Sequence, residues 1–241
     1  KGRFWFFIKM KNDLIVLLKK LNFWKNYNLC WIPTTVSTND DLKAIWRSEG
    51  FEQTIEIADV QTGGKGQYDR KWSSDDVGQC LMFSFTVDLK EYQFPVSMVA
   101  GVALAVALEN LGVNVKDFWL KWPNDIWLND KKLAGILTES TTLNGGFRTV
   151  VGIGINILPL RDKSIKAASL NEAGLSTNRE EVLLAFCEAW DKIFVLSDLE
   201  QTELWKKYSG QFWKREMTIV LPKGETIVAV PEKKKKDGAL I

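Results

Sequence analysis

The sequence predicts an α+β fold, because strand-like and helix-like segments are mixed from about residue 29 onward and short β-like pieces follow residue 211. The 241 residues suit one large domain, or one with a small companion, and 46% apolar residues can build a core. No run of about eighteen apolar residues occurs, so no transmembrane helix is predicted. The net charge of +2 gives no whole-chain argument for nucleic-acid or membrane partners.

The first 28 residues are basic, with seven Lys or Arg against the single acidic residue Asp13. Leu14, Leu18 and Leu21 have helix-like spacing, which predicts a short helix packed on the core. An arm that binds nucleic acid is the alternative. The segment is too short for a complete winged-helix domain.

Apolar alternation, β-branched residues and turn signals place the strands. They are predicted at residues 29–33, 54–60, 79–88, 118–122, 125–128, 133–138 and 148–156. Asn129-Asp130 and Asn144-Gly-Gly146 are turn signals of the hairpin type. The strands on either side of each turn are therefore expected to pair.

Capping residues and helical periodicity place the helices. They are predicted from about residue 38 to 47, and at residues 96–111, 180–195 and 199–208. Ser37-Thr-Asn-Asp40 supplies N-cap side chains, and Pro95 and Gly112 bracket the second helix. Short β-like pieces at 218–221 and 226–230 predict a small C-terminal β domain.

The residue types that are missing restrict the chemistry. There is no histidine, which excludes Ser-His-Asp and Cys-His nucleophiles, H-E-x-x-H metalloproteases and imidazole zinc sites. The residues left for catalysis suit phosphoryl or adenylyl transfer, where positioning and charge neutralisation dominate. Cys30, Cys80 and Cys187 form no C-x-x-C pair, so we expect buried thiols in a reducing, cytoplasmic compartment.

The segment Gln61–Trp72 combines three glycines in four positions with Lys65, Arg70 and Lys71. Glycines let the backbone approach a ligand closely, and the cations and free amides suit an anion such as phosphate or carboxylate. The pattern fits neither a Walker A loop nor a Rossmann fingerprint. An ordinary flexible loop is the alternative.

The segment Lys121-Trp-Pro-Asn-Asp125 is followed closely by Lys132. Pro123 makes the turn rigid, so that Asn124 and Asp125 project defined donors and acceptors. Asp125 can hold hydrated Mg²⁺, and Lys132 can neutralise a carboxylate or phosphate. A capped hairpin with solvated lysines is the alternative.

Two shorter segments complete the set. Val151-Gly-Ile-Gly-Ile-Asn156 predicts a strand with one bare face, against which a helix or a flat ligand packs. Ser37-Thr38-Asn39 either caps a helix or faces a small polar head group.

In order and spacing, these segments resemble the biotin–protein ligase family. The family pattern runs D-S-T-N/Q, then Q-T-x-G-R-G-R-x-G-R-x-W, then K-W-P-N-D with K-L-x-G-I-L-x-E, then G-I-G-I-N. The matching segments here are Val36–Asn39, Gln61–Trp72, Lys121–Asp125 with Lys132–Glu139, and Gly152–Asn156. The match covers about residues 30 to 235.

The resemblance implies a class II synthetase-like core, a mixed sheet with helices packed on one face, followed by a small SH3-like β domain. It divides the chain into a basic helical extension (1–28), a catalytic domain (29–198) and a C-terminal domain (199–241). The family's β domain continues beyond the hairpin that matches Lys233–Lys236, so we expect a reduced or incomplete domain here.

The resemblance also implies an activity. Such an enzyme forms biotinyl-5'-AMP from biotin and ATP with Mg²⁺, then transfers biotin to a lysine of a biotin carboxyl carrier protein. It is a cytoplasmic ligase without a membrane or DNA partner, and homodimers occur in the family.

Each site residue takes its expected role from the matching motif. The biotin-binding residues would be Ser37, Thr38, Asn39, Gln61, Lys65, Gly66, Gln67 and Gly135. Those at the ATP or adenylate would be Trp72, Asn124, Lys132 and Asn156. Catalytic roles would fall to Lys132, Asp125, Lys65 and Arg70, with Asp125 also near the metal.

The chain departs from the family pattern in its glycine-rich loop. Lys65 and Gln67 stand where the family has arginine, and Asp69 stands where it has glycine. Lysine keeps the charge but loses the bidentate fork, whereas Gln67 and Asp69 lower the positive charge. We therefore predict weaker retention of the anionic adenylate than is typical of the family.

Three alternatives are weighed against this interpretation. A lipoate or octanoate ligase would carry R-R-x-S/T-G-G-G-x-V-x-H, which this chain lacks. A biotin-responsive DNA-binding repressor would need more residues before the core than the 28 present. A catalytically silent ligand-binding homologue would fit the departures in the loop.

Overall fold

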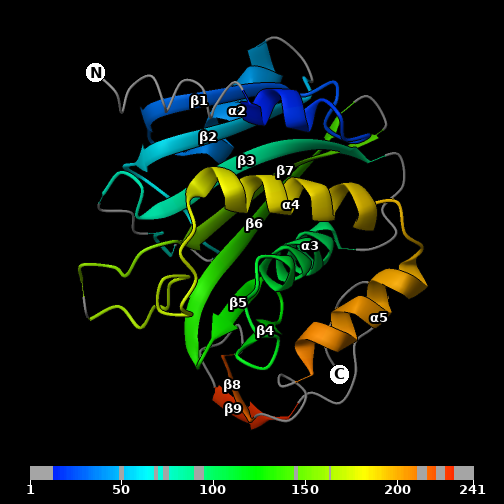
Figure 1. Ribbon diagram of the computed structural model, residues 1–241. Coiled ribbons are helices and arrows are strands. Elements are labelled where there is room, and N and C mark those ends of the chain that lie inside the picture. The colour runs from blue at the N-terminus through cyan, green and yellow to red at the C-terminus, as the bar shows by residue number, and fades with distance from the viewer. Residues whose placement is uncertain are drawn as a thin grey trace.

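The computed structural model describes residues 13–48, 52–67, 70–72, 76–89, 95–143, 146–162, 164–210, 216–220 and 226–230. Its centre is a seven-stranded sheet in the order β1-β2-β3-β7-β6-β5-β4 (Figure 1). The strands are β1 (Asn28–Thr35), β2 (Thr54–Gln61), β3 (Cys80–Leu89), β4 (Phe118–Lys121), β5 (Asp125–Leu128), β6 (Lys131–Leu143) and β7 (Gly146–Asn156). β1 and β2 are parallel and the other neighbours are antiparallel, so the predicted mixed sheet is confirmed.

The predicted hairpins lie in the second half of this sheet. Asn129 and Asp130 both have positive φ, 46° and 65°, and connect β5 to β6 in the conformation that asparagine and aspartate tolerate best. β6 and β7 pair along their length as expected. Residues 144 and 145 of their predicted turn lie outside the described residues.

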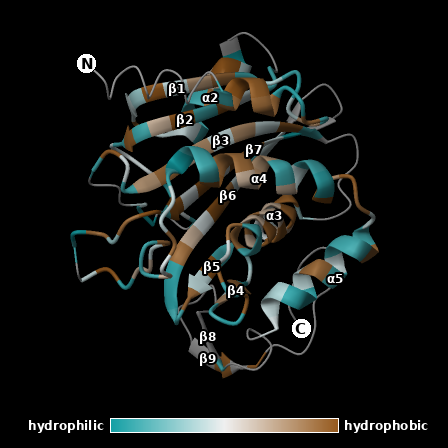
Figure 2. Ribbon diagram, in the orientation of Figure 1, coloured by the Kyte–Doolittle hydropathy of each residue, from teal (hydrophilic) through white to brown (hydrophobic). Residues whose placement is uncertain are grey.

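Side-chain alternation along β3 separates the two faces of the sheet. Phe83 and Phe85 belong to the main core, whereas Ser84 between them points to the opposite face. The helices α3 (Val96–Asn110) and α4 (Arg179–Ile193) cover the core face (Figure 1). α3 is apolar on nearly all sides, because it lies between the sheet, α4 and α5 (Figure 2).

The opposite face carries α2 (Thr38–Ser48), whose Leu42 and Trp46 pack on Val150 of β7. Helices therefore lie on both faces, and the expectation of one covered face is correct for α3 and α4 but wrong for α2. The parallel pair β1–β2 requires a crossover connection, and α2 provides it on the face that α3 and α4 leave open. This placement brings the start of α2 to the glycine-rich strand β7.

The first described residues and the helix α5 also contact the core. Residues 13–18 form a short helix, and Leu14 and Leu18 are buried with Trp24, which confirms the expected packed helix. α5 (Asp198–Ser209) was assigned to the C-terminal domain, but it packs on α3 and β4, and Tyr208 stacks on Phe118.

The described part of the predicted C-terminal β domain is one antiparallel pair, β8 (Met217–Val220) and β9 (Thr226–Ala229). Its SH3-like architecture stays a prediction, and residues 1–12 and 231–241, with the Lys233–Lys236 hairpin, lie outside the described residues. Among the helices described, none combines the length and the hydropathy that crossing a bilayer requires.

Candidate functional site

A cavity of about 480 Å³ opens on the sheet face that carries α2. It brings together residues from four separate motifs. All the residues that the sequence singled out line it: Ser37, Thr38, Asn39, Gln61, Lys65, Gly66, Gln67, Arg70, Trp72, Asn124, Asp125, Lys132, Gly135 and Asn156.

One end of the cavity is formed by the start of α2. Ser37, Thr38 and Asn39 are 2%, 2% and 4% exposed, so these polar side chains lie inside the protein rather than on its surface. The parallel register pairs Thr35 with Gln61, which sets the end of β2 beside the start of α2. The Thr38 amide consequently donates a hydrogen bond to Gln61 Oε1 at 2.8 Å.

Ser84 is a member of this polar end that the sequence analysis missed. It is fully buried on β3 and lies 2.6 Å from Thr38 Oγ1 and 2.6 Å from Asn39 Oδ1. The available signal was a serine between Phe83 and Phe85, a polar residue on a strand that is otherwise buried on both faces.

The other end of the cavity is cationic. The β5–β6 pairing places Lys132 beside Asp125, with 2.7 Å between Nζ and Oδ1. The Trp72 indole lies near Lys132, whose Nζ is 5.8 Å from its ring centroid. A lysine held between a carboxylate and an aromatic face is positioned to meet an incoming anion.

Lys121 is a second missed residue at this end. It is half-buried, lines the cavity, and places its Nζ 4.0 Å from the ring centroid of Trp127. Burial lowers the pKa of Lys121; the Asp125 carboxylate opposes this, and the nearby charges of Lys132 and Arg70 lower it further. The available signal was its place at the start of the Lys121–Asp125 motif, in which only Asn124 and Asp125 were predicted to have roles.

Asn124 and Asn156 hold the backbone of the cationic end in place. Asn124 Nδ2 donates to the Ile136 carbonyl at 2.6 Å, which joins the Lys121–Asp125 turn to β6. Asn156 Nδ2 donates to the Ala168 carbonyl at 2.9 Å and its Oδ1 accepts from the Cys80 thiol. Both line the cavity while being engaged in protein contacts, so contact with an adenylate remains a prediction for them.

The described residues of the glycine-rich loop line the cavity and are joined by backbone hydrogen bonds between its two sides. Gly66 N donates to the Arg70 carbonyl at 2.6 Å, and Trp72 N donates to the Gly64 carbonyl at 2.9 Å. Lys65 Nζ lies 2.5 Å from Asp40 Oδ2 on α2, which ties the loop to the polar end. Asp69, one of the residues that depart from the family pattern, lies outside the described residues.

The residues near Asp125 offer few ligands to the Mg²⁺ that the family resemblance implies. The described residues contain no group of three or more acidic, histidine or cysteine side chains that could hold an ion. Asp125 is the carboxylate of the cationic end, and its Oδ1 faces Lys132. One carboxylate is compatible with Mg²⁺ that is bound mainly by nucleotide phosphates, and not with a dedicated protein cage.

The chain is similar to several known ligases. "Biotin--protein ligase 2" of Arabidopsis thaliana is 30% identical over 181 residues, which is 70% of this chain and 53% of that protein. "Bifunctional ligase/repressor BirA" of Escherichia coli (strain K12) is 37% identical over 131 residues, which is 51% of this chain and 40% of that protein. The chain thus spans about half the length of the curated relatives it matches.

The fold has close counterparts among solved structures. The biotin protein ligase from Aquifex aeolicus in complex with biotin and ATP superposes with a TM-score of 0.66 and 26% identity, covering 88% of this chain and 90% of that one. A family model matches residues 31–156, which include the cavity residues from α2 to β7. The chain belongs to the biotin/lipoate A/B protein ligase family.

Proposed function

We propose that this chain is an ATP-dependent biotin–protein ligase. The observation that carries the proposal is one continuous cavity with a buried polar end at Thr38 and Asn39 and a cationic end at Lys132. Biotin has a polar cyclic urea at one end and a carboxylate at the other, and it fits such a cavity. The biotin and ATP named for the Aquifex aeolicus structure support the same ligands here.

In the first step, a biotin carboxylate oxygen attacks the α-phosphorus of ATP. The bond from that phosphorus to the bridging oxygen breaks, and pyrophosphate leaves with the electron pair. Lys132, Lys65 and Arg70 line the cavity and supply positive charge to the phosphate oxygens. Neither a histidine nor a covalent enzyme nucleophile is required, because positioning and charge neutralisation carry the reaction.

In the second step, the amine of an acceptor lysine attacks the acyl carbon of the mixed anhydride. The carbon–oxygen bond to AMP breaks, an amide forms, and the amine loses a proton. Lys132 stays beside the carbonyl and phosphate oxygens throughout.

The remaining parts of the proposal rest on the family resemblance. The acceptor is a biotin carboxyl carrier protein, Mg²⁺ neutralises the triphosphate, and the protein forms a homodimer. Residues 29–198 supply the catalytic domain, and residues 199–241 supply the C-terminal domain, whose β strands follow the helix α5.

The test is a biotinylation assay read by intact mass. The chain is incubated with biotin, ATP, Mg²⁺ and a purified biotin-carrier domain, and we expect the carrier to gain one biotin on one lysine. A parallel reaction with octanoate or lipoate in place of biotin is expected to leave the carrier mass unchanged. An unmodified carrier, in an assay where a known ligase modifies it, would refute the proposal.

A further inference from the structure

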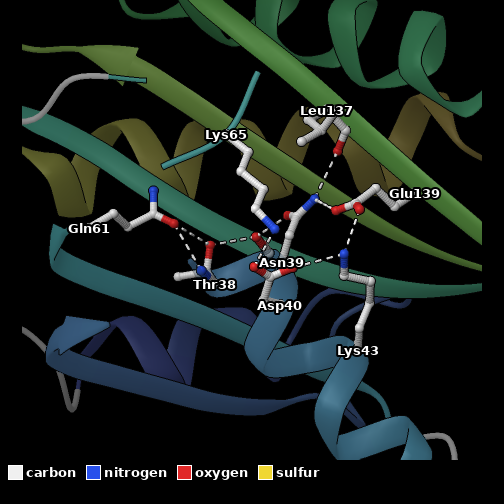
Figure 3. A network of polar contacts seen from close by, with 9 residues as sticks. Thr38, Asn39, Asp40, Lys43, Gln61, Lys65, Leu137 and Glu139 are labelled. Atoms are coloured by element: carbon white, nitrogen blue, oxygen red, sulfur yellow. Dashed lines mark hydrogen bonds and ion pairs between the residues drawn. The ribbon is translucent and has the colours of Figure 1, made fainter. Parts of the chain in front are cut away.

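A chain of polar contacts runs behind the polar end of the cavity (Figure 3). Asp40 accepts from Lys65 at 2.5 Å and from Lys43 at 2.9 Å. Lys43 also reaches Glu139 Oε1 on β6 at 2.5 Å, and Glu139 Oε2 accepts from Asn39 Nδ2 at 2.8 Å. Of the described residues in this network, Asn39 lines the cavity whereas Glu139 does not.

The Glu139 carboxylate decides how the Asn39 amide is oriented. An ionised carboxylate only accepts hydrogen bonds, so the NH₂ group of Asn39 must face it. The carbonyl of Leu137 lies 3.5 Å from the same nitrogen and favours the same orientation. Asn39 Oδ1 therefore points the other way, toward Ser84 Oγ at 2.6 Å.

The orientation of Asn39 determines the directions of the next two hydroxyl protons. Ser84 has one proton, and it is donated to Asn39 Oδ1, which only accepts. In the 2.6 Å contact between Ser84 and Thr38, Thr38 must then be the donor. Gln61 Oε1 accepts from the Thr38 amide at 2.8 Å and lies farther from Thr38 Oγ1, at 3.3 Å, so the Thr38 hydroxyl proton is directed mainly to the closer Ser84. Thr38 and Asn39 consequently present oxygen lone pairs, and not protons, to the cavity.

We propose that Glu139 is a positioning residue that makes the polar end of the cavity an acceptor of hydrogen bonds, and so selects a ligand with N–H donors. This rests on the proposed function, because the cyclic urea of biotin provides two such N–H groups. Glu139 acts through Asn39 and Ser84 without touching the ligand. The proposal adds a residue outside the cavity to those that determine ligand choice.

Two further features hold this arrangement in place. Although burial lowers the pKa of Lys43, its hydrogen bonds to Glu139 and Asp40 raise it, so Lys43 remains a cation beside Glu139. On the other side, Gly152 leaves room for the amide, because a Cβ there would lie 2.2 Å from Asn39 Oδ1. The Asn39 amide thus packs between the Glu139 carboxylate and the backbone of β7 at Gly152.

The test is titration calorimetry of biotin binding to the full chain. In Glu139→Gln one of the two carboxylate oxygens is replaced by an NH₂ group, so either Lys43 or the Asn39 amide faces a donor in place of an acceptor, and the Asn39 amide loses its fixed orientation. We expect biotin affinity to fall by about 10- to 100-fold, as for a buried polar group left without its partner. Affinity for ATP should change by less than about 3-fold, because Trp72 and Lys132 are untouched; a merely structural defect would weaken both ligands.

Exchanging the amide of Asn39 and the carboxylate of Glu139 should restore biotin binding. Asn39→Asp alone sets two carboxylates face to face, and we expect it to weaken biotin binding as well. In the double variant Asn39→Asp/Glu139→Gln, the amide introduced on β6 can donate to the carboxylate introduced on α2, which again offers acceptors to Ser84 and the ligand. Its biotin affinity should return to within about 5-fold of the unmodified chain.

Glu109→Gln is the matched control, since Glu109 also accepts from a lysine, Lys207, but lies between α3 and α5, away from the cavity. If Glu139→Gln does not fold, Ser84→Ala is used in its place. It removes the hydroxyl that links Asn39 to Thr38 and should therefore weaken biotin binding. Unchanged biotin affinity in Glu139→Gln or Ser84→Ala, or a double variant no better than the singles, would overturn the assignment. Absence of biotin binding by the unmodified chain would overturn the proposed function together with it.

Discussion

Gly154 of β7 lies directly beneath the indole of Trp72: a Cβ at position 154 would be 2.5 Å from Trp72 Cε2. Two residues earlier on the same face, a Cβ at Gly152 would be 2.2 Å from Asn39 Oδ1. Alternate residues of a strand share a face, so the two glycines form one bare surface. That surface receives the polar end of the cavity at Gly152 and the aromatic side chain of the cationic end at Gly154.

The two glycines should therefore have separable functions. Gly154→Ala should displace Trp72 and lower affinity for ATP by at least about 10-fold, since contacts this short cannot be tolerated without movement. Gly152→Ala should displace Asn39 and lower biotin affinity by a similar factor. Each variant serves as the control for the other in equilibrium titrations with both ligands. Equal losses of both affinities in both variants would show a general distortion of β7.

These two contacts also show what the sequence could and could not predict. Glycine alternation predicted a bare strand face and something packed on it, because the pattern is local to residues 151–156. Which side chain would fill each gap depended on contacts between residues about 80 to 110 positions apart, such as Asn39 with Gly152 and Trp72 with Gly154. Residue types and spacing carry no such information for a single sequence.

Dependence on contacts between distant residues also explains where the structure differs from the sequence prediction. The positions of the strands and α3 followed from periodicity, whereas the face chosen by α2 depended on the β1–β2 crossover, a property of the whole sheet. Ser84 and Glu139 belong to the polar network only after β3, β6 and α2 are assembled. All fourteen residues singled out by sequence line the cavity, because the motifs that contain them were recognised as a set.

Lys132 provides the sharpest test of the cationic end. Lys132→Ala should reduce the rate of biotinyl-AMP formation by orders of magnitude, because it removes a charge placed to stabilise the transferring phosphoryl group. The rate is measured by pyrophosphate release in single-turnover reactions, with thermal unfolding to confirm that the fold is intact. Lys131→Ala is the control, since Lys131 is an exposed neighbour 4.0 Å from Glu172. Near-normal rates in Lys132→Ala would remove Lys132 from the proposed mechanism.

Gln67 should set how firmly the adenylate is retained. Gln67 lines the cavity where the family pattern has arginine, so Gln67→Arg adds a cation beside the anionic intermediate. We expect dissociation of preformed biotinyl-AMP to slow by about 10-fold, the effect of one charge-assisted contact of about 1.4 kcal/mol. Gln67→Met tests side-chain bulk without charge. Slow release from the unmodified chain, with no change in Gln67→Arg, would contradict the predicted weak retention.

Glu56 should make the stability of the fold depend on pH. It lies on β2 opposite α2, is 5% exposed, and has a buried Oε1 without a hydrogen-bond partner among the described residues. Burial, followed by the hydrogen bond and charge of Asp41, raises the pKa of Glu56 from 4.5 to about 8. Between these two values the folded chain holds a proton that the unfolded chain has lost. The free energy of unfolding therefore falls as pH rises through this window, and Glu56 contributes no pH dependence below or above it.

Glu56→Gln should remove this dependence, since the amide resembles the protonated acid and does not titrate. The difference in unfolding free energy between Glu56→Gln and the unmodified chain should grow in favour of the variant from pH 4.5 to 8, by at most about 1.4 kcal/mol per pH unit. Urea denaturation at pH 5, 6.5 and 8 measures it, with the exposed Glu52→Gln as control. A constant difference across these three pH values would show that the pKa of Glu56 is the same in the folded and unfolded chain, and would contradict the prediction.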